Sequence, residues 1–93
     1  MTERYVQTQV LKALKERNFY HVKIVSASTS GHPDCIACIG GVFVAIEFKS
    51  DCGKLSSLQI YRLSEIKKNE GMIFVVSLKN LKDMLHWIRH VDL

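Results

Sequence analysis

The pair Gly40-Gly41 separates two short apolar runs, and this pattern constrains the fold more than any other part of the chain. The runs cover residues 34–39 and 42–49, and each has the length of a β-strand. Two such runs joined by two glycines predict a β-hairpin, because glycine readily adopts the backbone angles of a tight turn. Counting outward from the turn then places Asp34 opposite Glu47.

Hydrophobic periodicity in the rest of the chain predicts the element order α-β-β-β-α-β-α. Residues 42–48 are apolar on both faces, so this strand is expected to be central in the sheet. The other predicted elements are a helix at 3–17, a strand at 20–26, a helix at 54–69 capped by Ser56 or Ser57 and ended by Gly71, a strand at 72–76, and a helix at 78–90 capped by Ser77 with Leu78 on its apolar stripe. The fold class is therefore α/β, a small mixed β-sheet flanked by helices.

Length and composition limit the class of protein. A chain of 93 residues predicts one domain, residues 1–93, with a modest core. Chains of this size often gain stability by dimerisation. A hydrophobic content of 47% excludes disorder, and the net charge of +4 favours an anionic partner, although a solvated basic surface explains it equally well. The sequence has neither a membrane span nor a signal peptide, so we expect a cytoplasmic protein with reduced thiols.

The predicted hairpin brings Asp34 and Glu47 together at its open end. Cross-strand Cβ atoms lie about 5 Å apart, so two carboxylates there repel each other unless a cation sits between them. Mg²⁺ or Mn²⁺ suits such an oxygen site. Lys49 shares the face of Glu47 and can orient a water or a phosphate, which indicates metal-assisted phosphodiester hydrolysis. The alternative is an ordinary Glu47–Lys49 ion pair, with Asp34 capping the loop.

Two polar residues interrupt apolar helix stripes. Glu3 lies in the stripe of the first helix, where it either points toward the sheet or sits at a frayed, exposed helix end. Gln59 lies in the inner face of the second predicted helix, where its amide must find hydrogen bonds. It can hold a catalytic carboxylate or water, or simply bond to a backbone carbonyl.

Together these segments resemble the virus-type replication-repair nuclease domain, VRR-NUC, of the PD-(D/E)xK nuclease superfamily. The resemblance extends from Glu3 to about Ser77 and rests on Gly31-His32-Pro33-Asp34, Glu47-Phe48-Lys49 and residues 53–59 followed by Gly71. It implies a restriction-endonuclease-like core with Glu3, Asp34, Glu47, Lys49 and Gln59 as catalytic residues. Asp34 and Glu47 would bind one or two Mg²⁺ or Mn²⁺ ions, helped by the carbonyl of Phe48 and by Glu3. Cys35, which follows Asp34, departs mildly from the family pattern.

The same resemblance implies the partners. Small members of the family are phage or bacterial proteins that resemble Holliday-junction resolvases, so we expect a homodimer that cleaves branched DNA in replication or repair, without a small-molecule cofactor. The sequence leaves open which DNA structure is cut, and DNA rather than RNA rests on the resemblance alone. A flap or single-strand nuclease and a non-catalytic nucleic-acid-binding module on the same fold are the alternatives.

Cysteines and histidines offer a rival metal chemistry. Cys35 and Cys38 have zinc-like spacing, and the further ligands to consider are His32, Cys52, His86 and His90. However, positions three apart on a strand point to opposite faces, so we expect small apolar cysteines rather than a zinc site. Trp87 lies off the main helical stripe, where a dimer interface and a partly buried core position are both open.

Overall fold

The computed structural model describes residues 2–93, and Met1, the first residue of the predicted domain, lies outside the described residues. The elements are α1 (Thr2–Glu16), β1 (Tyr20–Lys23), β2 (Cys35–Ile39), β3 (Val42–Phe48), α2 (Ser57–Lys68), β4 (Met72–Val76) and α3 (Leu81–His90). The predicted order α-β-β-β-α-β-α is confirmed. In the described part of the chain, every helix is too short or too polar to cross a membrane.

The sheet has the strand order β1-β2-β3-β4 and is mixed, as predicted. The pairs β1–β2 and β2–β3 are antiparallel, whereas β3 and β4 run parallel. In the β2–β3 hairpin Ile39 pairs with Val42 and Cys35 with Ile46, which confirms the register counted from the turn. Gly40 and Gly41 both have positive φ angles, of 58° and 83°, as a tight turn between twisted strands requires.

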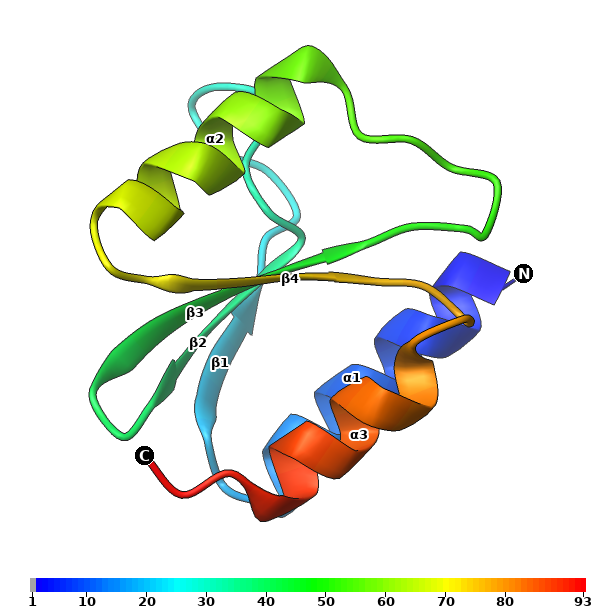
Figure 1. Ribbon diagram of the computed structural model, residues 1–93, viewed down its shortest axis with the longest axis vertical. Coiled ribbons are helices and arrows are strands. Elements are labelled where there is room, and N and C mark those ends of the chain that lie inside the picture. Colours follow the sequence, from blue (N-terminus) through cyan, green and yellow to red (C-terminus); the bar gives the residue numbers. More distant parts are fainter. Residues whose placement is uncertain (1) are drawn as a thin grey trace.

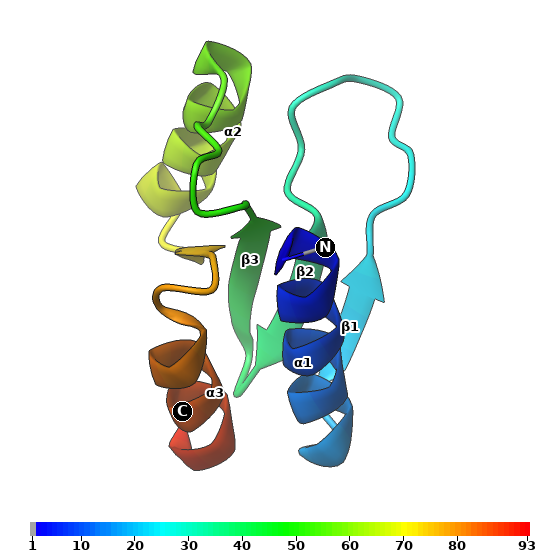
Figure 2. The same cartoon turned by 90° about the vertical axis from the view of Figure 1, so that its right-hand side faces the viewer.

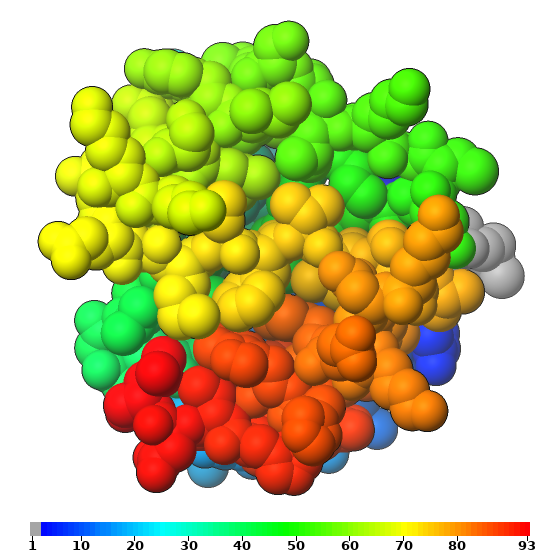
Figure 3. Space-filling model, viewed as in Figure 1, coloured from blue at the N-terminus to red at the C-terminus, as the bar shows by residue number. Residues whose placement is uncertain are grey.

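The sheet separates two helical layers. Figure 1 shows α2 above the sheet and α1 and α3 together below it, and Figure 2 shows the same arrangement turned by 90°. In the space-filling view, β4 runs along the surface between α2 and α3 (Figure 3). The guanidinium of Arg17 links the two lower helices, because it donates to the carbonyl oxygens of Ile88 (2.9 Å) and Val91 (3.0 Å).

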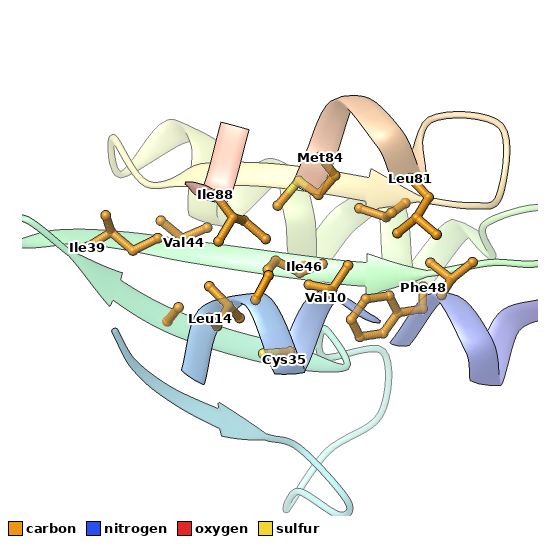
Figure 4. Packing of buried hydrophobic residues seen from close by; sticks show 14 residues of the cluster. Val10, Leu14, Cys35, Ile39, Val44, Ile46, Phe48, Leu81, Met84 and Ile88 are labelled. Carbon is orange, nitrogen blue, oxygen red and sulfur yellow. The ribbon is translucent and has the colours of Figure 1, made fainter. Parts of the chain in front are cut away.

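The hydrophobic core lies between the sheet and the α1–α3 layer. Side chains of β3 alternate into it at Val44, Ile46 and Phe48, where they meet α1 and α3 (Figure 4). Ala45, on the other face of β3, is also fully buried. The prediction that β3 is a central strand covered on both sides is therefore confirmed along most of its length. A rigid central strand fixes the position of whatever side chains follow at its end.

Some predicted boundaries are wrong. The strand predicted for 20–26 ends at Lys23, before a loop that runs to β2. The last helix begins at Leu81 rather than at residue 78, and Leu78 is 47% exposed instead of lying on the buried stripe. Ser77 does not cap this helix, because the N-cap position is Asn80, whose Oδ1 accepts a hydrogen bond from the backbone N–H of Ser77 (2.8 Å). Such local side-chain bonds compete with helix formation.

The end of α2 uses Glu70 where glycine was expected. Glu70 adopts a left-handed conformation (φ 69°), and its N–H bonds to the carbonyl of Lys67 while that of Gly71 bonds to Ile66, as in a Schellman motif. Gly71 serves close packing instead. A Cβ atom on Gly71 would lie 2.6 Å from Cγ2 of Ile66.

Replacing Glu70 by glycine should stabilise the protein. A side chain in the left-handed region costs about 1–2 kcal/mol, whereas the added freedom of glycine in the unfolded chain costs about 0.4–1 kcal/mol. We therefore expect Glu70→Gly to raise the free energy of unfolding by roughly 0.5–1 kcal/mol in urea titrations. The matched control is Glu70→Ala, which removes the charge but keeps the strain. An equal gain in Glu70→Ala would show that backbone strain is not the cause.

Candidate active site

The hairpin places Asp34 and Glu47 next to each other. Asp34 directly precedes β2 and Glu47 is the penultimate residue of β3, so the observed register puts them opposite each other one step beyond the Cys35–Ile46 pair. The backbone N–H of Phe48 donates to Oδ2 of Asp34 (2.8 Å), which fastens this aspartate to the end of β3. The side chain of Glu47 is only 3% exposed. A carboxylate buried to this degree requires partners.

The partners of Glu47 come from α2 and from its own strand. Nε2 of Gln59 donates a hydrogen bond to Oε2 of Glu47 (2.8 Å). Nζ of Lys49 lies 3.7 Å from the same oxygen, because residues 47 and 49 share one side of the chain. The structure therefore brings together Asp34, Glu47, Lys49 and Gln59, four of the five residues predicted to be catalytic.

The orientation of Gln59 is fixed by the start of α2. Oγ of Ser56 accepts from the backbone N–H of Gln59 (3.1 Å), and Oε1 of Gln59 accepts from the backbone N–H of Ser56 (2.9 Å). This reciprocal pair is a capping box. Because the amide oxygen is engaged there, the amide NH₂ faces Glu47. Ser56 was predicted only as a helix cap, although the pattern Ser-x-x-Gln contained the signal for this second role.

The surroundings of Glu47 raise the pKa of its carboxyl from the ordinary value of 4.5 to about 7. Burial is the main cause and repulsion by Asp34 comes next, while Lys49 and a backbone hydrogen bond from Asp34 partly oppose them. Glu3 adds a further small repulsion. The predicted conflict between two adjacent carboxylates is thus present, and it is the kind of conflict that a bound cation relieves.

The position of Glu3 agrees partly with each of its two predicted positions, one facing the sheet and one at an exposed helix end. Its side chain is exposed at the first turn of α1, yet it is close enough to act on the charge of Glu47. Over residues 2–93, no group of three or more His, Cys, Asp or Glu side chains is arranged to hold a metal ion. The acidic site is accordingly a pair, Asp34 and Glu47, with Glu3 at its periphery.

The cysteines do not converge. Cys35 is buried and Cys38 is exposed, because they lie on opposite faces of β2 as strand geometry requires. Burial, followed by the charge of Asp34, raises the pKa of the Cys35 thiol to about 11, so it is a poor metal ligand or nucleophile. The exposed rings of His86 and His90 stack on α3 with their centroids 4.2 Å apart.

Trp87 belongs to the edge of the core. It is partly buried, and its ring packs against Phe74 of β4 with the two centroids 4.7 Å apart. Of the two positions considered for this residue, the structure supports the one in the core of the chain itself.

Comparison with solved structures agrees with this architecture. A structure described as "VRR_NUC domain" superposes with a TM-score of 0.78 and 23% sequence identity, covering 97% of this chain and 97% of that one. The chain has the fold of a VRR_NUC domain. No family model and no curated protein sequence matches it. The VRR_NUC fold therefore spans nearly all of the chain, and the predicted fold class is confirmed.

The buried carboxylate should make the metal-free protein less stable as the pH rises. The pKa of Glu47 is about 7 in the folded state and near 4.5 when unfolded, so the folded state holds a proton that the unfolded state has released. This contribution is complete below the unfolded value and is lost as the pH rises through about 7, by no more than about 3 kcal/mol. Urea titrations in EDTA at a series of pH values measure it.

The control for this pH dependence is Glu47→Gln, which keeps the acceptor for Gln59 without the charge. Its stability should vary less with pH in the interval between the two pKa values. Asp34, Lys49 and Glu3 also face this carboxylate, and they are unchanged in the variant. Identical pH profiles for the two proteins would contradict the raised pKa.

Removing the Ser56 hydroxyl should disturb both α2 and Gln59. Ser56→Ala deletes the acceptor for the Gln59 backbone, so we expect a loss of about 1 kcal/mol in the free energy of unfolding. Ser56→Thr keeps a capping hydroxyl and should retain most of the stability. In ¹H–¹⁵N NMR spectra, the side-chain amide signals of Gln59 should move in the alanine variant and stay close to their original positions in the threonine variant. Unmoved amide signals in both would show that the cap does not orient Gln59.

Proposed function

We propose that the protein is a divalent-metal-dependent DNA endonuclease that hydrolyses phosphodiester bonds in structured DNA. The observation that carries this proposal is the pairing of the buried Glu47 with Asp34, with Gln59 and Lys49 both engaged on Glu47. The likeness to a structure named VRR_NUC domain supports the same reaction class.

The residues present fit a hard divalent cation. Asp34 and Glu47 offer adjacent carboxylate oxygens, and their mutual repulsion favours an ion between them. The N–H of Phe48 points to Asp34, and in an extended strand the C=O of the same residue points to that side as well. The carbonyl of Phe48 is thus a reasonable additional ligand, with Glu3 acting directly or through water. Bound Mg²⁺ or Mn²⁺ would supply an activated water and neutralise negative charge at the phosphate.

The remaining side chains have supporting roles. Lys49 carries the positive charge next to the acid pair, where it orients the attacking water or helps to deprotonate it, and it stabilises charge on the phosphate. Gln59 keeps the carboxylate of Glu47 in place through its fixed amide. Outer groups of this kind set the direction of ligand oxygens.

Branched DNA is the substrate that we propose, by analogy with Holliday-junction resolvases. A homodimer with two-fold symmetry would present two such sites, which suits a symmetric four-way junction. The setting would be the cytoplasm of a bacterial or phage-infected cell. Flap or single-strand cleavage, and nucleic-acid binding without cleavage, are the competing outcomes.

Cleavage should require both carboxylates and a divalent ion. We expect Asp34→Asn and Glu47→Gln to lower the cleavage rate of four-way-junction, flap or single-stranded DNA by at least about a hundredfold, because each removes charge where the reaction needs it. Gln59→Ala should cost about 10–100-fold, as loss of an outer-shell partner does. Gel assays with Mg²⁺, Mn²⁺ or EDTA measure these rates on all three substrates.

The control is Asp83→Asn, which neutralises an exposed carboxylate on α3 and should leave the rate unchanged. Calorimetric titration with Mn²⁺ should show binding to the unsubstituted protein and weaker binding to Glu47→Gln. Cleavage at normal rates by Asp34→Asn would refute the assignment. DNA binding that is never followed by metal-dependent cleavage would favour the non-catalytic module.

A further inference from the structure

A groove runs over the sheet between α2 and the loop that joins β1 to β2. Figure 2 shows these two segments rising on either side of the end of β3. The groove consists of two adjoining hollows of about 380 and 330 Å³, which share His32, Phe43 and Ile66 in their linings. Hollows of this size are typical of sites for compact ligands.

An exposed aromatic ring forms part of the groove. Phe43 is 45% exposed although it lies on the central strand. By strand register Tyr20, Cys38 and Phe43 form one cross-strand row on the same face of the sheet, and Tyr20 is 70% exposed. Two exposed rings along one sheet face provide stacking surfaces for successive nucleobases.

The wall of the groove carries an oriented cation. Nε of Arg62 donates to the carbonyl of Ser30 (3.2 Å), and its Nη1 lies 3.5 Å from Oε1 of Glu65. The ring of His32 is held by Thr29, with 2.7 Å between Nε2 and Oγ1. The guanidinium of Arg62 lines the same hollow as the ring of Phe43. This combination suits a planar group with polar edges better than an aliphatic group.

Residues that line the groove are close neighbours, along the chain, of the residues of the acid site. His32 and Pro33 line it and directly precede Asp34, while Arg62 follows Gln59 by three residues, less than one helical turn. Phe43 and Glu47 lie on the same face of β3, about 13 Å apart along the strand. A strand with its phosphodiester at the acid pair would therefore bring a base a few nucleotides away to Phe43.

We propose that this groove binds unpaired nucleobases of the substrate strand, with Phe43 as the stacking platform and Arg62 on the wall. Tyr20, which lies outside the two hollows in the same cross-strand row as Phe43, is the platform for a neighbouring base. The inference rests on the proposed function and narrows its substrate: among branched DNA structures it favours those with unpaired nucleotides beside the cleaved bond, such as flaps, over a fully paired four-way junction. A second copy of the chain is a weaker candidate, because a stable interface needs about 800 Å² per partner of complementary surface, and this site is recessed with a charged rim.

Fluorescence anisotropy in EDTA tests the proposal without cleavage. The probes are a labelled oligothymidylate of about 12 nucleotides and a duplex of the same length, at one fixed salt concentration. We expect the single strand to bind more tightly than the duplex. Phe43→Ala and Phe43→Leu should each weaken single-strand binding by roughly tenfold, and Phe43→Trp should retain it, because stacking rather than apolar bulk holds the base.

Tyr5→Ala is the matched control, since Tyr5 is a comparably exposed aromatic residue (54%) on α1, which lies on the side of the sheet opposite to α2 (Figure 1). It should bind like the unsubstituted protein. Cys38 gives a second readout in a Cys52→Ser background: bound oligothymidylate should slow its reaction with a maleimide. Thermal unfolding of each variant shows whether weaker binding comes from loss of the fold. If Phe43→Ala does not fold, the affinity of Phe43→Leu and the protection of Cys38 test the proposal.

Equal affinities of Phe43→Leu and the unsubstituted protein, or an unprotected Cys38, would overturn the proposal. So would a change in sedimentation of Phe43→Leu with unchanged binding, because the face would then be an interface between copies. Failure of the groove proposal can be distinguished from failure of the proposed nuclease function. Phe43-dependent binding by a protein that never cleaves would support the groove and refute the nuclease, whereas acid-dependent cleavage with unaltered Phe43→Leu binding would do the reverse.

Discussion

Burial of the Glu47 carboxylate at the end of the central strand is the constraint on which the site depends. A charge in this position costs free energy unless it is compensated, and the surrounding elements each supply part of the compensation. Gln59 donates from α2, Lys49 approaches from the end of the strand, and Asp34 adds a repulsion that works in the opposite sense. Once the turn at Gly40-Gly41 has formed, the sheet register places Asp34 beside Glu47, whereas the contact from Gln59 depends on how α2 packs.

Most of the fold was accessible from the sequence because local and tertiary preferences agree. The double glycine determines a register, β3 is apolar on both faces, and β4 was predicted with its observed bounds. Errors occur where short-range polar contacts decide the conformation. Asn80 takes the N–H of Ser77 and delays α3 by a turn, and Glu70 occupies a left-handed position that pattern rules assign to glycine. Such choices depend on single hydrogen bonds that periodicity does not register.

The candidate site was accessible to a different degree. Strand alternation and counting from the turn were sufficient to bring Asp34, Glu47 and Lys49 together. The inward position of Gln59 on α2 predicted a polar contact but not its partner, since that requires the packing of α2 on the sheet. The groove beside Phe43 left no signal in the pattern, because a phenylalanine on a central strand reads as core. Its exposure follows from how far α2 and the β1–β2 loop stand apart in three dimensions.

The capping box of α2 has a consequence for the dynamics of the site. Because the Gln59 side chain both closes the first helical turn and holds Glu47, fraying of that single turn removes the hydrogen bond from Gln59 to the carboxylate while the sheet stays intact. Helix ends open far more often than whole domains unfold. The exchange rate of the Gln59 backbone amide therefore reports how often Glu47 loses its hydrogen bond from Gln59, and a ligand that slows this exchange must bind the form in which the bond is made.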